Sequence, residues 1–150
     1  MTHVPYPYKN LETMRYIFIS IGKKRIAKAV DFRPLKTNNF VNLSFGDLLP
    51  NGSIDDSISS NNGDIVKVLA TVVDILKHFT TQHPETLIFF AGSSDERTKL
   101  YTRILKTYYI PFGKEYAIYG IINMGEYYET VPFDPKSDLD YLAFVIKKNN

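Results

Sequence analysis

Residues 87–91 form a wholly apolar stretch of this 150-residue sequence, and this short run constrains the fold more than any other feature. Five residues are too few to span a membrane, which takes about 20. A continuous apolar run of this length is typical of a strand that is buried on both faces of a sheet. Helical patterns precede and follow it, so we expect residues 86–91 to form a central strand between two helices.

The first helical pattern begins after the turn Asn61-Asn62-Gly63 and ends before Pro84. Asn is a favourable N-cap residue, and Asp64 in the first turn suits the helix dipole. The broad apolar stripe is typical of a helix that lies flat on a sheet. It comprises Ile65, Val66, Leu69, Ala70, Val72, Val73, Leu76 and Phe79. We expect a core that joins Val66, Leu69, Val73 and Leu76 to Ile88, Phe89 and Phe90.

The second helical pattern follows the central strand and reaches about Tyr109. Ser93 and Glu96 fit the capping-box spacing, which predicts Ser93 as the N-cap. Its inward residues are expected to be Leu100, Tyr101, Ile104, Leu105 and Tyr108.

Strand patterns account for most of the remaining chain. We expect strands at residues 14–21, 25–32, 40–48, 53–59, 115–122 and 139–147, an acidic, Tyr-rich loop at 123–135, and an extended arm at 1–13. The predicted order is β-β-β-β-α-β-α-β-β. This order indicates one α+β domain over residues 1–150, with a twisted, mixed, mostly antiparallel sheet and two main helices.

Composition excludes several kinds of site. The chain has no cysteine, which rules out thiol catalysis, thiolate zinc sites and disulfides. Its three histidines lack metal-ligand spacing, and turns and caps account for most of Asp47, Asp55, Asp56 and Asp64. We therefore expect no metal, no cofactor and no membrane association, and a cytoplasmic location.

The charges are unevenly distributed although the net charge is only +2. Lys23, Lys24, Arg25 and Lys28 lie in a basic stretch whose only acid is Asp31. A second basic set comprises Arg97, Lys99, Arg103 and Lys106, and acids gather at Glu126, Glu129, Asp134, Asp138 and Asp140. Such segregation indicates either solvated faces or a surface for nucleic acid or a partner. Some of the 11 tyrosines should line a groove or an interface.

The two helix openings offer a candidate anion site. If the strands before them run parallel, both openings lie at one edge of the sheet, where free backbone N–H groups favour a phosphate. The candidate residues are Asn61, Asn62, Gly63, Gly92, Ser93, Ser94 and Arg97. The alternative is that Asn62 and Ser93 only cap their helices.

Several motifs resemble a family of small bacterial proteins of about this length that is catalogued as a domain of unknown function. They are Tyr6-Pro7-Tyr8-Lys9, Asn42-Leu43-Ser44-Phe45-Gly46-Asp47, Ile54-Asp55-Asp56, Asn61-Asn62-Gly63-Asp64 and Ala91-Gly92-Ser93-Ser94. This resemblance covers nearly the whole chain and implies no particular activity.

The order of elements is also similar to the C-terminal two-thirds of GNAT-type acetyltransferases. In those enzymes a glycine-containing basic loop opens the first of these helices and binds the pyrophosphate of acetyl-CoA. Here Ser60-Asn61-Asn62-Gly63 keeps one glycine of that loop and lacks its basic residue.

Two classes of function therefore stay open. One is a binding module, for example one partner of a toxin–antitoxin or defence pair, which uses its basic hairpin and Tyr-rich loop on protein or RNA. The other is a small GNAT-like transferase or nucleotide-handling enzyme that holds a phosphate-containing molecule at the two helix openings. The small size and the lack of a catalytic constellation favour the first, and a homo-oligomer is compatible with either.

Overall fold

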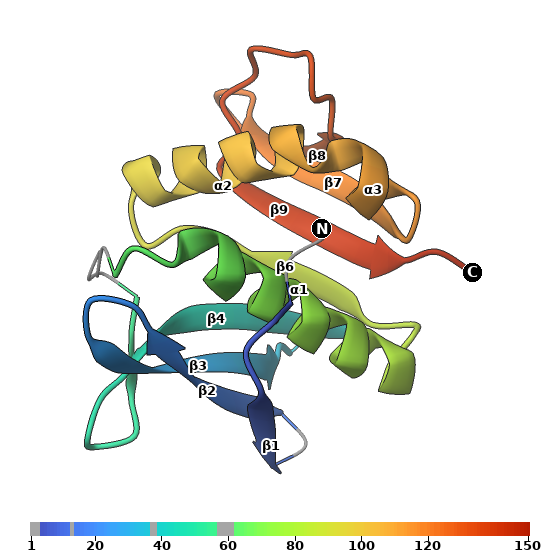
Figure 1. Cartoon of the computed structure of the whole chain (residues 1–150). Helices are drawn as coiled ribbons and strands as arrows, with labels where there is room; N and C mark the ends of the chain where they lie inside the picture. The colour runs from blue at the N-terminus through green and yellow to red at the C-terminus, as the bar shows by residue number, and fades with distance from the viewer. Residues whose placement is uncertain (1–3, 13, 37–38, 57–61) are drawn as a thin grey trace. The chain divides into compact units, whose positions relative to one another are not determined.

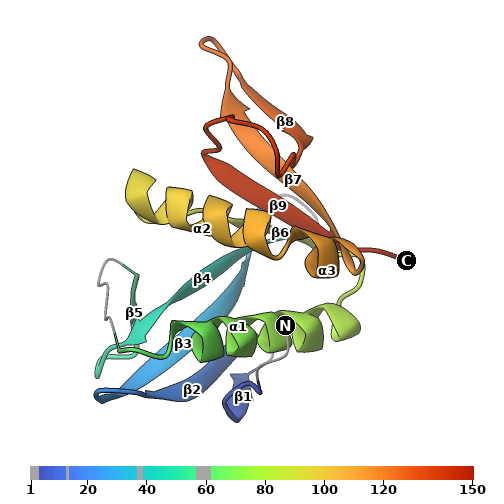
Figure 2. The ribbon, with the colours of Figure 1, turned by 45° about the horizontal axis from the view of Figure 1, so that its top comes forward.

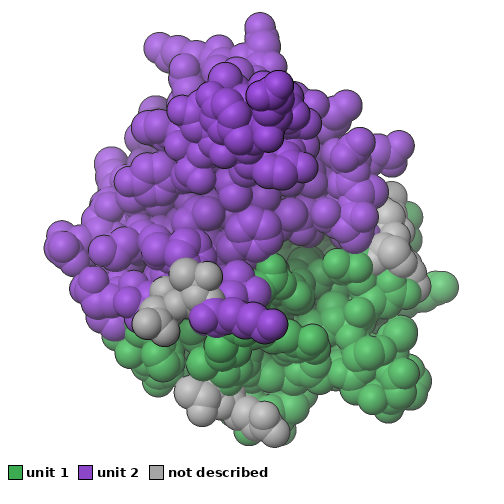
Figure 3. Space-filling view, turned by 180° about the vertical axis from the view of Figure 1, so that it is seen from behind, with its two compact units in different colours: residues 1–34, 42–83 green, residues 35–41, 84–150 purple. Residues whose placement is uncertain are grey.

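The computed structural model describes residues 4–12, 14–36, 39–56 and 62–150. It confirms an α+β fold with mostly antiparallel strands and two main helices. The chain forms two compact units (Figure 3). Unit 1 comprises Met1–Pro34 and Asn42–His83, and unit 2 comprises Leu35–Val41 and Pro84–Asn150. Each unit is discontinuous in sequence. The prediction of a single domain stays a prediction.

Unit 1 is a sheet with one long helix against it (Figures 1 and 2). Its elements are β1 (Tyr8–Glu12), β2 (Arg15–Ile21), β3 (Arg25–Pro34), β4 (Phe40–Leu48), β5 (Ile54–Asp55) and α1 (Ile65–Gln82). The strand order is β1-β2-β3-β4, and β5 pairs with β4. The hairpin expected near residues 14–32 is thus present, with Arg15 opposite Asp31 and Ile21 opposite Arg25. Within the expected arm, β1 pairs with β2.

The core of unit 1 is aromatic. The rings of Phe32 on β3 and Phe79 on α1 stack with centroids 3.9 Å apart, and Tyr16 packs edge-on against Phe32. The buried face of α1 differs from the predicted stripe, because Ile65 is 57% exposed and Leu69 is only half-buried. The buried residues are Val68, Ala70, Thr71, Ile75, Leu76, Phe79 and Thr80.

Two threonines explain part of this difference. Thr71 and Thr80 are buried with their hydroxyl groups bonded to the carbonyls of Lys67 and Leu76, one turn earlier. A hydroxyl that bonds its own helix can be buried at little cost, so hydrophobicity alone misplaces the inward face.

In unit 2 the helices lie on one face of the strands (Figure 2). Its elements are β6 (Leu87–Phe90), α2 (Asp95–Thr107), α3 (Tyr109–Gly113), β7 (Tyr116–Asn123), β8 (Tyr128–Pro132) and β9 (Ala143–Lys148). Within it the order is β6-β9-β7-β8, and these pairs are antiparallel. The ring contacts Phe90–Tyr101 and Phe112–Tyr116 join this sheet to α2 and α3.

Residues 35–41 precede β6 by more than 40 positions, yet they belong to unit 2. The Leu87 N–H donates to the Asn39 carbonyl at 2.6 Å, which fixes the start of β6. Asn39 itself has a φ of 66°, in the left-handed region that Asn tolerates better than most residues.

Unit 2 also departs from the predicted elements. The central strand β6 is shorter than the expected strand at 86–91 and ends at Phe90. Of the four residues of β6, Ile88 is buried and the others are half-buried, so the strand is not buried on both faces throughout. The expected loop at 123–135 contains β8, which makes a hairpin with β7. The last strand starts at Ala143, because residues 134–142 form a loop. Among the described residues, no helix is long and apolar enough to cross a membrane.

Candidate functional site

The first half of the predicted anion site closes the β2–β3 hairpin. Asn62 is buried, and its side-chain amide donates to Ser20 Oγ at 3.0 Å and to the Lys24 carbonyl at 2.8 Å. Its Oδ1 accepts from the Lys24 N–H at 2.7 Å. Both amide N–H groups are therefore used within unit 1. Gly63 is exposed with a φ of 82°, and Asn61 lies outside the described residues.

Asn62 also explains a glycine in that hairpin. A Cβ at Gly22 would lie 1.8 Å from the Asn62 carbonyl oxygen, which itself accepts from the Lys23 N–H at 3.0 Å. The turn approaches the backbone before α1 so closely that only glycine fits.

Asp64 is the N-cap residue of α1, but its carboxylate makes no capping hydrogen bond. It accepts instead from Ser20 Oγ at 2.5 Å and from the Tyr6 hydroxyl at 2.6 Å. The Tyr6 hydroxyl accepts in turn from the Ile21 N–H at 3.0 Å. We call Tyr6, Ser20, Asn62 and Asp64 the buried polar cluster; it ties the N-terminal segment and β2 to the start of α1.

The cluster shifts two pKa values. Burial alone would raise the pKa of the Asp64 carboxyl, but the hydrogen bonds from Ser20 and Tyr6 outweigh it and lower that pKa. Burial, followed by the hydrogen bond to Asp64, raises the pKa of Tyr6. Asp64 is thus ionised and Tyr6 neutral near neutral pH, as a donor–acceptor pair requires.

The second half of the predicted anion site lies in unit 2, at the start of α2. The prediction of Ser93 as N-cap is wrong: Ser94 is the N-cap, and its Oγ accepts from the Arg97 N–H at 3.3 Å. Two residues before this cap, Gly92 closely approaches Thr98. A Cβ at Gly92 would lie 2.4 Å from the Thr98 nitrogen, and the Gly92 N–H donates to Thr98 Oγ1.

The first turn of α2 carries Asp95 and Glu96. Their carboxylates already complement the helix dipole and oppose a second anion. Binding of a phosphate group at Gly92, Ser93, Ser94 and Arg97 stays a prediction. Among the described residues there is also no group of three or more His, Asp or Glu placed to hold a metal ion.

The predicted basic surface divides into two environments. Lys23, Lys24 and Arg25 are exposed at the β2–β3 turn. Lys28, by contrast, is 7% exposed, pairs with Asp47 at 2.5 Å and lies 5.9 Å from the centroid of the Phe45 ring. Lys28 therefore does not contribute to the exposed surface of the turn.

The β7–β8 hairpin presents large side chains to solvent. Tyr119, Met124, Tyr127 and Tyr128 are 37%, 48%, 59% and 70% exposed, respectively. Gly125 allows the tight turn with a φ of 101°, and the Met124 N–H donates to the Tyr127 carbonyl at 2.9 Å. We call these four residues the hairpin surface. The exposed acids Glu126 and Glu129 lie beside it in sequence.

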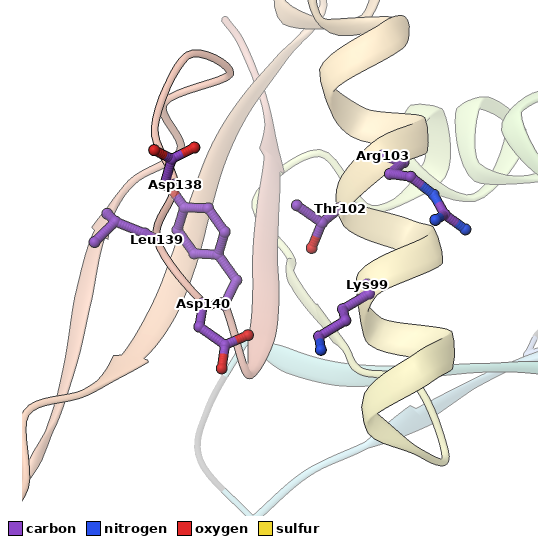
Figure 4. A pocket seen from close by; sticks show the side chains of 7 residues that line it. Lys99, Thr102, Arg103, Asp138, Leu139 and Asp140 are labelled. Carbon is purple, nitrogen blue, oxygen red and sulfur yellow. The ribbon is translucent and has the colours of Figure 1, made fainter.

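A cavity of about 400 Å³ lies between α2 and the 134–142 loop (Figure 4). It is lined by Lys99, Thr102, Arg103, Asp138, Leu139, Asp140 and Tyr141. The sequence shows both the second basic set and the acids of the loop, but nothing in it indicates that they lie on opposite sides of one cavity.

Three comparisons relate this chain to known proteins. A model of DUF6934, described as a family of unknown function, matches residues 2–149. The search of curated proteins and the search of solved structures give no match. None of them supports the resemblance to GNAT-type acetyltransferases.

Proposed function

Since the chain belongs to DUF6934, a family of unknown function, we propose from its surface that the protein is a binding module whose β7–β8 hairpin binds a protein partner. The observation that carries this proposal is the hairpin surface. Four large side chains with high exposure gather on one short hairpin, whereas isolated exposed apolar residues are the norm. Tyrosine and methionine are also enriched in protein interfaces.

The strand pairing shows on which face of the hairpin Tyr119 and Tyr128 lie. Tyr119 pairs with Pro132, and Asn123 pairs with Tyr128. Directly paired residues share a face and faces alternate along a strand, so Tyr119 and Tyr128 lie on the same face of the hairpin. That face is opposite the one on which Phe112 of α3 stacks on Tyr116, because 116 and 119 differ in parity.

The hairpin also ends the sheet of unit 2. In the described strand order, β8 lies at the edge and pairs with β7. An edge strand can accept another strand through its backbone groups, while the side chains provide specificity. The nearby Glu126 and Glu129 favour a basic segment. The partner we propose is thus a protein with an extended, basic stretch that lies along β8.

Site-specific crosslinking in cells tests this proposal. A photoreactive phenylalanine analogue at Tyr128 should give one prominent protein adduct, and the same analogue at exposed Lys114 should not. The identified protein, once purified, should bind the wild-type chain and lose at least about tenfold in affinity against Tyr127→Ser/Tyr128→Ser, as for interface hot spots. Lys114→Ser is the matched control and should bind normally.

An RNA partner is the competing outcome. If adducts at Tyr128 are absent and RNA is retained through Lys23 and Lys24, the proposal fails. Retention that weakens steeply with salt and is lost in Lys23→Glu/Lys24→Glu would identify that outcome. A toxin–antitoxin or defence pair is one setting that a small protein-binding module fits, and the identity of the crosslinked protein tests it.

A further inference from the structure

The cavity between α2 and the 134–142 loop has two walls of opposite charge. Lys99, Thr102 and Arg103 come from α2, and Asp138 and Asp140 from the loop. In Figure 4, Lys99 and Thr102 extend toward the loop, and Lys99 lies across the cavity from Asp140; Arg103 extends away from the loop. Its volume of about 400 Å³ is within the range of small-molecule sites, roughly 300–1,000 Å³.

The facing charges are not used within the chain. No ion pair or side-chain hydrogen bond of the described residues includes Lys99, Asp138 or Asp140, although other cations of the chain are paired, such as Arg15 with Asp31 at 2.7 Å. Opposite charges that face each other across a gap without closing it leave room for groups that complement both.

Fixed contacts set the spacing of the two walls. The Lys106 ammonium, on α2, donates to the Ser137 carbonyl of the loop at 2.9 Å. Tyr141 is buried, and its hydroxyl accepts from the Asp134 N–H at 3.1 Å. Its ring occupies the space above Gly120, where a Cβ would lie 2.1 Å from a ring carbon. A site with preset walls loses less entropy when a ligand binds.

These features restrict the ligand class. A simple anion would be repelled by Asp138 and Asp140, and a simple cation by Lys99. A molecule with both a carboxylate and an ammonium group satisfies both walls, and Tyr141 provides apolar area for an aliphatic part. We propose that this cavity binds a small zwitterion, an α-amino acid with an apolar side chain, separately from the hairpin surface.

A set of three leucine compounds tests the proposal on the whole chain. Leucine carries both charges, N-acetyl-leucine only the carboxylate, and leucinamide only the ammonium. Leucine should shift the backbone amide NMR signals of residues 99–103 and 138–141 in a saturable titration. Each blocked compound should bind at least about tenfold more weakly, the equivalent of about 1.4 kcal/mol. Equal binding of all three, or no saturable shift with leucine up to its solubility, would overturn the proposal.

Two variants that each remove one charge test which ligand group each wall of the cavity contacts. Lys99→Met should weaken the binding of leucine but not that of leucinamide, and Asp140→Asn should weaken the binding of leucine but not that of N-acetyl-leucine. Lys114→Met, which removes an exposed charge outside the cavity, should bind leucine like the wild type. If neither Lys99→Met nor Asp140→Asn alters leucine binding, any binding lies elsewhere and the assignment is wrong. Both variants change exposed residues, so their amide spectra should otherwise match the wild type.

Discussion

At the scale of single residues, Asp64 shows that a carboxylate at the N-cap position can accept hydrogen bonds from other segments instead of capping its helix. Its oxygen accepts from Ser20 and Tyr6, residues far away in sequence, instead of from N–H groups of α1. The sequence prediction sets the helix start too early, with Asn62 as the cap and Asp64 in the first turn, whereas Asp64 is the N-cap and Ile65 the first helical residue. It cannot indicate the partners of the side chains, which are 44 and 58 positions away.

Asp64→Asn should lower the free energy of unfolding by about 1–3 kcal/mol near neutral pH, because hydrogen bonds to a charged group are lost. The folded-state pKa of Asp64 lies below its ordinary value of 3.8, so the stabilisation is present above that pH and is lost as the pH falls through the folded pKa. Urea unfolding from about pH 7 to about pH 2 measures the difference between the two proteins. The difference should shrink below about pH 4, whereas a constant difference would contradict the ionised role. Glu126→Gln, at an exposed turn, is the control.

Tyr8 provides the corresponding test at high pH. Burial, with the hydrogen bond to the Asp74 carboxylate at 2.9 Å and the charge of that group, raises the pKa of Tyr8 from 10.0 to about 12. Its contribution to stability is therefore complete below pH 10 and is lost as the pH rises to about 12. Tyrosinate absorbance should show one fewer late-titrating group in Tyr8→Phe. If the late phase is unchanged, Tyr8 titrates normally.

At the scale of elements, the buried face of α1 is set by packing. Phe79→Ala should cost about 3–5 kcal/mol, because Phe79 is fully buried against Phe32. Ile65→Ala, at a residue that the periodicity places in the core, should cost much less, since Ile65 is mostly exposed. Equilibrium unfolding of both variants measures the contrast. Equal losses of unfolding free energy would support the apolar stripe that the periodicity predicts.

Gly120 on β7 leaves room for the ring of Tyr141 from the 134–142 loop. Gly120→Ala should destabilise the chain by about 1–3 kcal/mol, because the new Cβ would overlap the Tyr141 ring. Tyr141→Leu should relieve that overlap, so the double variant should lose less than the sum of the single losses. Gly113→Ala meets no atom within 4 Å and should be nearly neutral in the same thermal-unfolding measurement. Strict additivity would show that the two residues do not touch.

The sequence predicts elements better than sites. Periodicity and turn residues identify the β2–β3 hairpin, α1, β6 and α2, because each depends on local chemistry. It misses β8 in a stretch rich in charges and tyrosines, since a strand at a sheet edge shows little apolar alternation. The burial of Asn62 and Lys28 also escapes it, because their partners Lys24 and Asp47 are distant in sequence.

At the scale of the whole molecule, both units are discontinuous, and this limits how the chain can be divided. Fragment 84–150 contains all the strands and helices of unit 2 except the start of β4, but it lacks residues 35–41 and hence the Asn39 carbonyl that fixes Leu87. Alone it should give a poorly dispersed NMR spectrum, and addition of fragment 1–83 should restore dispersion. A well-dispersed spectrum of the isolated fragment would contradict this dependence.

The position of residues 35–41 also orders events on the ribosome. Leu87 is added 48 residues after Asn39, which takes about 2–10 s at roughly 5–20 residues per second. During that time residues 35–41 have been synthesised, but their partner in β6 has not. Unit 2 therefore cannot include residues 35–41 until β6 has been synthesised, although those residues are made first.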